Sequence, residues 1–166
     1  MQTDALSAVK REANLKTDLY QNLARQLHSL LDGERDFVAN AANLSSLLYH
    51  SLPGLNWAGF YVRGKDELVL GPFQGKPACV RIAMGKGVCG TAAEYRQTII
   101  VDNVHAFPGH IVCDSASNSE IVIPLIKGES LLGVLDLDSP AFARFDEEDA
   151  RGLNELAGIF LAATDI

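Results

Sequence analysis

Thiols and carboxylates gather in one part of this 166-residue sequence. The residues concerned, all within the stretch 77–138, are Cys79, Cys89, Cys113, Asp136 and Asp138. Cysteine sulfurs carry out thiol–disulfide exchange and reversible oxidation, and carboxylates bind cationic groups and transfer protons. This combination points to redox chemistry on a small zwitterion.

The two aspartates alternate with leucines in the string LDLD, residues 135–138. Residues two apart on a strand point to the same face, so Asp136 and Asp138 repel each other unless water, a cation, a shared proton or a donor relieves them. Spacing alone favours a solvated strand end as much as a functional site. The functional interpretation is an ammonium site in which one carboxyl stays protonated and acts as a hydrogen-bond donor or general acid. Glu120, at the start of the neighbouring strand, can supply a third carboxyl.

The three cysteines lie in different local contexts. Cys113 falls in the loop string PGHIVCD, where backbone N–H groups and a nearby imidazole favour the thiolate. Cys89 stands between glycines near a predicted helix start and has a similar environment. Cys79 falls in a predicted strand, where a buried, inert thiol is expected. Each cysteine alone is typical of packing, but three beside a carboxylate pair favour chemistry.

A zinc site is a competing interpretation, because His110 and Cys113 have the spacing of half a ligand set. The sequence contains no Cys-x-x-Cys pair, and His28, His50 and His105 have no matching partners. Structural zinc is therefore disfavoured. The glycine-rich string GKGVCG likewise lacks the Gly-Lys-Ser/Thr ending of a phosphate loop.

Two aromatic residues occupy one predicted strand in phase. Trp57, the single tryptophan, and Tyr61 are four residues apart and are expected on the same face of the sheet. Core packing is the ordinary role of such residues. The alternative is an aromatic wall for an apolar or sulfur-bearing ligand group.

Composition indicates one globular domain, since 48% of the residues are hydrophobic and 21% are charged. A net charge of −7 without a Lys/Arg cluster argues against nucleic acid and anionic membrane surfaces as partners. The charged N-terminal residues fit neither a signal peptide nor a membrane span. An odd number of cysteines does not suggest a stabilising disulfide framework, and a cytoplasmic location is expected.

Periodicity predicts an α+β domain over residues 17–166, preceded by an N-terminal leader over residues 1–16. The predicted elements are helices over 17–31 (with an N-cap at Thr17), 36–49, 90–96 and from 146 onward, and strands over 57–62, 67–73, 79–82, 99–101, 120–126 and 131–138. Residues 102–118 are expected to be a long irregular segment. We expect one mainly antiparallel sheet with helices on one face, and a ligand pocket on the other face beneath the long loop and the short helix.

Several strings closely resemble the free methionine-(R)-sulfoxide reductases, a family of GAF domains. The strings are NWAGFY (56–61), GPFQGKPAC (71–79), GKGVCGTAA (85–93), FPGHI (107–111) with CD (113–114), SEIV (119–122) and GVLDLDSP (133–140). The resemblance implies a single GAF domain with a six-stranded antiparallel sheet. It also implies reduction of free L-methionine (R)-S-oxide to methionine through a cysteine sulfenic acid and a disulfide, with thioredoxin as reductant and no metal or organic cofactor.

The resemblance also implies roles for individual residues. Cys113 resembles the attacking cysteine, with Cys79 or Cys89 as the resolving one. Glu120, Asp136 and Asp138 resemble the acids that hold the substrate ammonium and the sulfoxide oxygen. Trp57 and Tyr61 resemble the aromatic wall at the methyl end. The backbone N–H groups of Ile111, Val112 and Cys113 resemble those that bind the carboxylate.

Two alternatives remain at this point. One is a GAF sensor that binds a small ligand without turnover. The other is a thiol redox switch that acts on a protein partner. Homodimerisation is also left open.

Overall fold

The computed structural model describes residues 2–166, and for residues 2–10 and residue 13 it describes the backbone only. The elements, in chain order, are α1 (Gln2–Leu30), α2 (Phe37–Ser51), β1 (Trp57–Arg63), β2 (Glu67–Gly75), β3 (Arg81–Ala83), α3 (Gly87–Tyr95), β4 (Ile99–Val101), the 3-10 helix η1 (Val104–Ala106), β5 (Ser119–Lys127), β6 (Ser130–Ser139) and α4 (Glu147–Ala163).

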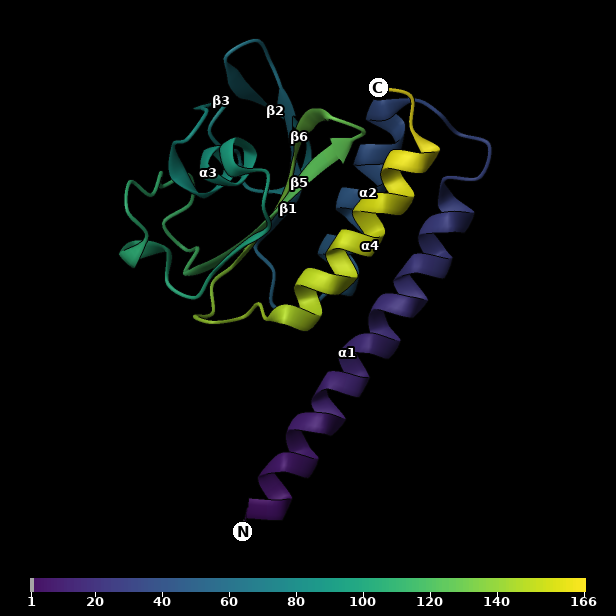
Figure 1. Cartoon of the computed structure of the whole chain (residues 1–166), viewed down its shortest axis with the longest axis vertical. Coiled ribbons are helices and arrows are strands. Elements are labelled where there is room, and N and C mark those ends of the chain that lie inside the picture. Colours follow the sequence, from purple (N-terminus) through teal and green to yellow (C-terminus); the bar gives the residue numbers. More distant parts are fainter. Residues whose placement is uncertain (1) are drawn as a thin grey trace.

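Six strands form one sheet in the order β3-β2-β1-β6-β5-β4, and every neighbouring pair is antiparallel. Helices α1, α2 and α4 form a layer on one face of this sheet, whereas α3 lies on the other face (Figure 1). The predicted α+β architecture is confirmed. The face that carries α3 is the one on which a ligand pocket was expected.

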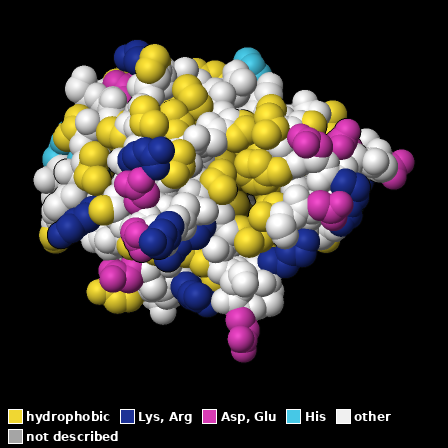
Figure 2. Space-filling view, turned by 90° about the horizontal axis from the view of Figure 1, so that it is seen from above, with side chains coloured by type: hydrophobic (Ala, Val, Ile, Leu, Met, Phe, Trp, Pro, Cys, Tyr) yellow, Lys and Arg dark blue, Asp and Glu magenta, His cyan; other side chains and the backbone are white. Residues whose placement is uncertain are grey.

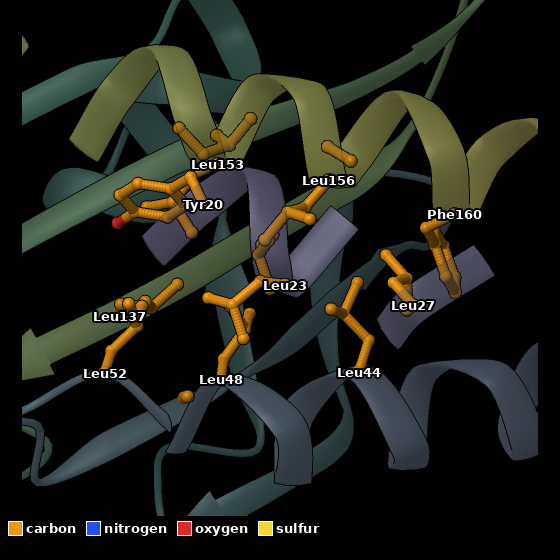
Figure 3. Packing of buried hydrophobic residues seen from close by; sticks show 14 of the residues in the cluster. Tyr20, Leu23, Leu27, Leu44, Leu48, Leu52, Leu137, Leu153, Leu156 and Phe160 are labelled. Carbon is orange, nitrogen blue, oxygen red and sulfur yellow. The ribbon is translucent and has the colours of Figure 1, made fainter. Parts of the chain in front are cut away.

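The main core lies between the sheet and the three long helices. Apolar residues three and four apart form a stripe on each helix. The stripes of α2 and α4 face the sheet, the stripe of α1 packs against α2 and α4, and Figure 3 shows these stripes meeting. The labelled members are Tyr20, Leu23 and Leu27 of α1, Leu44 and Leu48 of α2, Leu52, Leu137 of β6, and Leu153, Leu156 and Phe160 of α4. This core covers one face of the sheet and leaves the opposite face to build a site.

Strand β6 shows how the sheet separates its two faces. Leu135 and Leu137 are fully buried in the core beneath the long helices, whereas Val134 belongs to a second apolar cluster on the α3 side. Because side chains alternate along a strand, Asp136 and Asp138 must project on the same side as Val134. The sheet therefore presents both aspartates to the face that α3 covers.

Helix α1 begins at Gln2 and not at the predicted N-cap Thr17. Its sequence contains no glycine or proline and is rich in strong helix formers, so nothing interrupts the helix at that point. Lys16 Nζ donates to Asp146 and Asp149 at the start of α4, at 2.7 Å in each case. These contacts tie the middle of α1 to the domain. The domain boundary at residue 17 remains a prediction.

The surface carries both charge signs close together. On the face shown in Figure 2, Lys and Arg side chains are interleaved with Asp and Glu, and hydrophobic side chains surround a hollow. Basic side chains do not gather on that face into the concentrated patch that nucleic acid requires. Among the helices of residues 2–166, none combines the length and the apolarity needed to span a bilayer.

Candidate active site

Three carboxylates converge on the α3 side of the sheet through strand register. Glu120 of β5 pairs with Asp138 of β6, which also pairs with Trp57 of β1. Two residues earlier on β6, Asp136 lies opposite Gly59. All three acids line the same pocket. The third carboxyl that the sequence suggested is therefore part of the site.

These acids are withdrawn from water. Glu120 is 7% exposed and Asp136 is 6% exposed, so the interpretation of a solvated strand end is wrong for Asp136. Burial raises the pKa of Asp136 to about 7. Burial, together with repulsion from Asp136, raises the pKa of both Glu120 and Asp138 well above the usual range of a carboxyl. Near neutral pH the cluster therefore retains protons and can act as a hydrogen-bond donor or general acid.

Cys89 lies beside this acid cluster, in the first turn of α3. The helix begins at Gly87, three residues earlier than predicted, and brings the buried thiol to 3.8 Å from Glu120 Oε1. Burial and the charges of Asp136 and Glu120 raise the pKa of Cys89 well above that of an ordinary thiol. Cys89 is therefore a protonated thiol and a poor nucleophile.

The other two cysteines form a disulfide. Cys79 and Cys113 are joined with a Cα–Cα distance of 5.5 Å, and both are partly exposed. The prediction that Cys79 is an inert strand thiol is wrong, because β3 begins only at Arg81 and Cys79 lies in the preceding loop. The bond connects that loop to the segment between η1 and β5.

The pocket brings Cys113 and the acids together. Its lining includes Cys113, Cys89, Glu120, Asp136 and Asp138. The cysteine predicted to be catalytic and the predicted carboxylates thus line one pocket. This juxtaposition is what a thiol-based reaction on a cationic ligand requires.

An aromatic wall borders the same pocket. Trp57 and Tyr61 both line it, and their rings stack with centroids 5.9 Å apart. The Trp57 indole N–H donates to the Lys76 carbonyl at 3.2 Å, and the Tyr61 hydroxyl donates to the Cys79 carbonyl at 3.0 Å. These bonds fix the rings and also hold the loop that carries Cys79.

A glycine makes room for that wall. Gly59 follows Trp57 by two residues on β1, and a Cβ added there would come to 2.8 Å from Trp57 Cη2. Such a contact is too close for any side chain. Gly59 therefore lets the indole lie flat over the sheet beside Phe73, whose ring centroid is 5.3 Å away.

The residues of the loop that contains Cys113 contribute unequally to the pocket lining. Ile111 lines the pocket, whereas the Val112 side chain is 60% exposed and is not part of the lining. Any role of Val112 in ligand binding must come from its backbone. Asp114 differs from the other acids: the Ala116 backbone N–H and the nearby Lys76 lower its pKa, and it accepts a hydrogen bond from Asn56 at 3.2 Å.

His110 is a pocket residue that the sequence interpretation treated as a neighbour of the Cys113 thiolate and as half of a zinc site, not as part of the pocket lining. Its Nε2 lies 4.0 Å from Glu120 Oε2, and burial together with neighbouring His105 lowers its pKa. The imidazole is therefore neutral at physiological pH. The sequence signal that could have predicted His110 in the pocket is that it precedes Ile111, a residue expected at the ligand site.

The chain is similar to known proteins over most of its length. A family model described as "GAF domain" matches residues 17–163. The chain is 53% identical over 153 residues to a free methionine-R-sulfoxide reductase of Escherichia coli, covering 90% of this chain and 93% of that protein.

Solved structures give the same relationship. A free methionine-R-sulfoxide reductase from Neisseria meningitidis in complex with its substrate is 46% identical and superposes with a TM-score of 0.86, covering 89% of each chain. A putative GAF sensor protein from Burkholderia vietnamiensis is 61% identical, with a TM-score of 0.87, covering 90% of this chain and 95% of that one.

Proposed function

This chain belongs to the free methionine-R-sulfoxide reductase family of GAF domains, and we propose that its pocket reduces free L-methionine (R)-S-oxide to L-methionine through a cysteine sulfenic acid and the Cys79–Cys113 disulfide. One observation carries this proposal. Cys113 lines the same pocket as three carboxyls, of which Glu120 and Asp136 are buried and raised in pKa.

The substrate is held at three points in this proposal. Its ammonium group lies against the acid cluster of Glu120, Asp136 and Asp138. Trp57 and Tyr61 contact the S-methyl end. Backbone N–H groups of residues 111–113 receive the carboxylate. A peptide-bound methionine sulfoxide lacks the ammonium and would leave buried acids unpaired, which explains selectivity for the free amino acid.

The chemistry uses two thiols and one proton donor. The Cys113 thiolate attacks the sulfoxide sulfur while a carboxyl protonates the sulfoxide oxygen. The oxygen passes to Cys113 as a sulfenic acid, and the thioether of methionine is released. The Cys79 thiol then displaces water from the sulfenic acid and forms the disulfide. Two electrons from the two thiols reduce the substrate, so no organic cofactor is needed.

The pairing of cysteines supports Cys79 as the resolving residue. Cys79 is already bonded to Cys113, whereas Cys89 is a free, buried thiol held beside Glu120. Its raised pKa makes Cys89 unsuited to attack a sulfenic acid. In this proposal Cys89 shapes the pocket and does not enter the disulfide.

Thioredoxin closes the cycle in this proposal, because the disulfide is reachable from solvent. Cys79 and Cys113 are partly exposed, and their sequence neighbours Val80 and Val112 are 61% and 60% exposed. Apolar side chains beside an exposed disulfide suit a protein reductant that docks before thiol exchange. Such recycling requires a reducing compartment, and we therefore place the protein in the cytoplasm.

The deciding experiment is a thioredoxin-coupled assay with four compounds: free L-methionine (R)-S-oxide, the (S)-epimer, N-acetyl-L-methionine (R)-S-oxide and L-methionine. Reduction of the first compound alone to its thioether, with oxidation of thioredoxin, supports the proposal. Binding of the free amino acid without methionine formation would instead favour a GAF sensor. Reversible oxidation of Cys113 with no amino-acid preference would favour a redox switch.

A further inference from the structure

A buried trio of potential metal ligands lies at the floor of the pocket. Cys89 Sγ, a carboxylate oxygen of Glu120 and one of Asp136 all lie within 4.8 Å of one another. The three residues are 3%, 7% and 6% exposed, respectively. We refer to Cys89, Glu120 and Asp136 as the acid–thiol trio. Sulfur and carboxylate oxygen together form a donor set for a borderline or soft cation.

The trio contains an unsatisfied polar atom. Asp136 Oδ1 is buried and has no hydrogen-bond partner among the described residues. More than nine-tenths of the Asp136 surface is also withdrawn from solvent. An unpaired buried oxygen is costly and indicates a missing partner. A substrate ammonium can fill this position. A metal ion can fill it as well.

The spacing of the trio is close to that of a tetrahedral zinc site. With a Zn–S distance of about 2.3 Å and a Zn–O distance of about 2.1 Å, sulfur and oxygen ligands stand about 3.6 Å apart. Cys89 Sγ and Glu120 Oε1 are 3.8 Å apart. The Cys89 and Glu120 ligand atoms therefore need to move only by tenths of an ångström to reach the separation found around a zinc ion, and a carboxylate oxygen of Asp136 lies within 4.8 Å of both. His110 lines the same pocket, and its Nε2 is 4.0 Å from Glu120 Oε2.

We propose that the acid–thiol trio binds a divalent cation of the zinc class, and that this ion occupies the place of the substrate ammonium and blocks the pocket. Metal binding displaces the proton of the Cys89 thiol to solvent. The resulting thiolate ligand selects zinc, cobalt or cadmium over magnesium and calcium, which prefer oxygen. Metal binding by the trio stands on its own geometry, whereas the competition with substrate rests on the proposed function.

The oxidised full-length protein is suited to the test, because its Cys79–Cys113 bond leaves Cys89 as the single free thiol of the three cysteines. Co²⁺ is the probe. We expect a near-ultraviolet thiolate-to-cobalt charge-transfer band that saturates at one ion per chain and disappears on addition of Zn²⁺ but not of Mg²⁺. The absence of this band, in folded protein with one titratable thiol, would overturn the proposal.

Variants assign the band to the trio. Cys89→Ser should abolish it, and Glu120→Gln and Asp136→Asn should each weaken Co²⁺ binding at least tenfold. Glu94→Gln removes an exposed carboxyl from the same helix as Cys89 and is the matched control, with unchanged affinity. Circular dichroism checks that each variant is folded. A band that survives in both acid variants would place the metal elsewhere and contradict the assignment.

Competition separates this inference from the proposed function. L-Methionine should raise the apparent dissociation constant of Co²⁺, whereas N-acetyl-L-methionine, which has no ammonium group, should not. If the trio binds cobalt but methionine does not displace it, the metal site stands and the ammonium role of these acids is wrong. If no cobalt binds while the reductase assay succeeds, the metal inference alone is refuted.

Discussion

Glu120 and Asp138 lie directly opposite each other on β5 and β6. Two like charges in such a cross-strand pair destabilise a sheet in water. Here burial, together with the nearby Asp136, raises the pKa of both carboxyls, so the pair is not fully ionised near neutral pH. The arrangement costs stability in the empty protein. In the proposed function it provides a proton and a cation site to the substrate.

Replacing Asp136, one of the three candidate proton donors, should strongly lower catalysis. Asp136→Asn keeps the shape of the side chain but cannot transfer a proton, and we expect kcat/KM for the free R-sulfoxide to fall by about 10²–10⁴-fold, the usual contribution of general acid catalysis. The measurement uses dithiothreitol as reductant, so that protein docking plays no part. Asp66→Asn, at the exposed turn between β1 and β2, is the control and should match the wild type. Unchanged activity in Asp136→Asn would refute the role of this acid.

The same substitution should change how stability depends on pH. The pKa of Asp136 is raised to about 7 in the folded protein from an ordinary value of 3.8, so the protonated form stabilises the fold. That stabilisation is complete below about pH 4 and is lost as the pH rises through 7. Asp136→Asn cannot ionise and should therefore gain stability relative to the wild type between pH 5 and pH 8, by on the order of 2 kcal/mol. Guanidinium unfolding at the two pH values measures this difference, and a pH-independent difference would contradict the raised pKa.

Single-turnover experiments should distinguish the two candidate resolving cysteines. In Cys79→Ser, the Cys113 sulfenic acid has no partner thiol within the observed bond, so it should accumulate and be trapped by dimedone. In Cys89→Ser, one turnover should still produce the Cys79–Cys113 disulfide. Mass spectrometry of the intact and digested protein reads both results. A Cys89–Cys113 bond in the wild type after turnover would reverse the assignment.

Docking of the reductant should depend on the apolar residues beside the disulfide. Val80→Asp places a charge next to Cys79, and we expect the KM for thioredoxin to rise about tenfold, which corresponds to about 1.4 kcal/mol. Turnover with dithiothreitol should not change, because a small thiol needs no docking surface. Val38→Asp is the matched control, since Val38 is also 61% exposed but lies on α2, on the far side of the sheet. Equal effects of the two variants would exclude a local docking surface.

Two glycines of α4 should respond to alanine in opposite directions. A Cβ at Gly152 would overlap the ring of Tyr20, whereas a Cβ at Gly158 would have nothing within 4 Å. Gly152→Ala should destabilise the protein by about 1–3 kcal/mol through overpacking between α1 and α4. Gly158→Ala should stabilise it by up to about 1 kcal/mol through helix propensity. Denaturant unfolding of both variants tests the close packing of these two helices.

Local pattern was sufficient to predict much of the architecture. The two-residue alternation in residues 134–138 correctly placed both aspartates on one face, because that period is fixed by strand geometry. The β4 prediction, residues 99–101, matches the strand in the structure. The N-cap predicted at Thr17 failed, because a capping residue is only one possible helix start and the preceding residues also favour helix.

Burial of the site could not be predicted from the same pattern. Whether Asp136 meets water depends on where α3 and the loop of Cys113 lie, and their positions are set by tertiary packing. The choice between Cys79 and Cys89 was open for the same reason, since loop residues distant in sequence decide which sulfurs approach. His110 gave only a weak signal, because a lone histidine in a loop has many possible roles.

The disulfide connects two separate loops at the rim of the pocket, one before β3 and one before β5. In the proposed cycle, every molecule of methionine formed leaves this disulfide oxidised, and an external electron donor must reduce it before Cys113 can attack the next substrate molecule. The supply of reducing equivalents, and not only the concentration of oxidised amino acid, would then set the pace of repair.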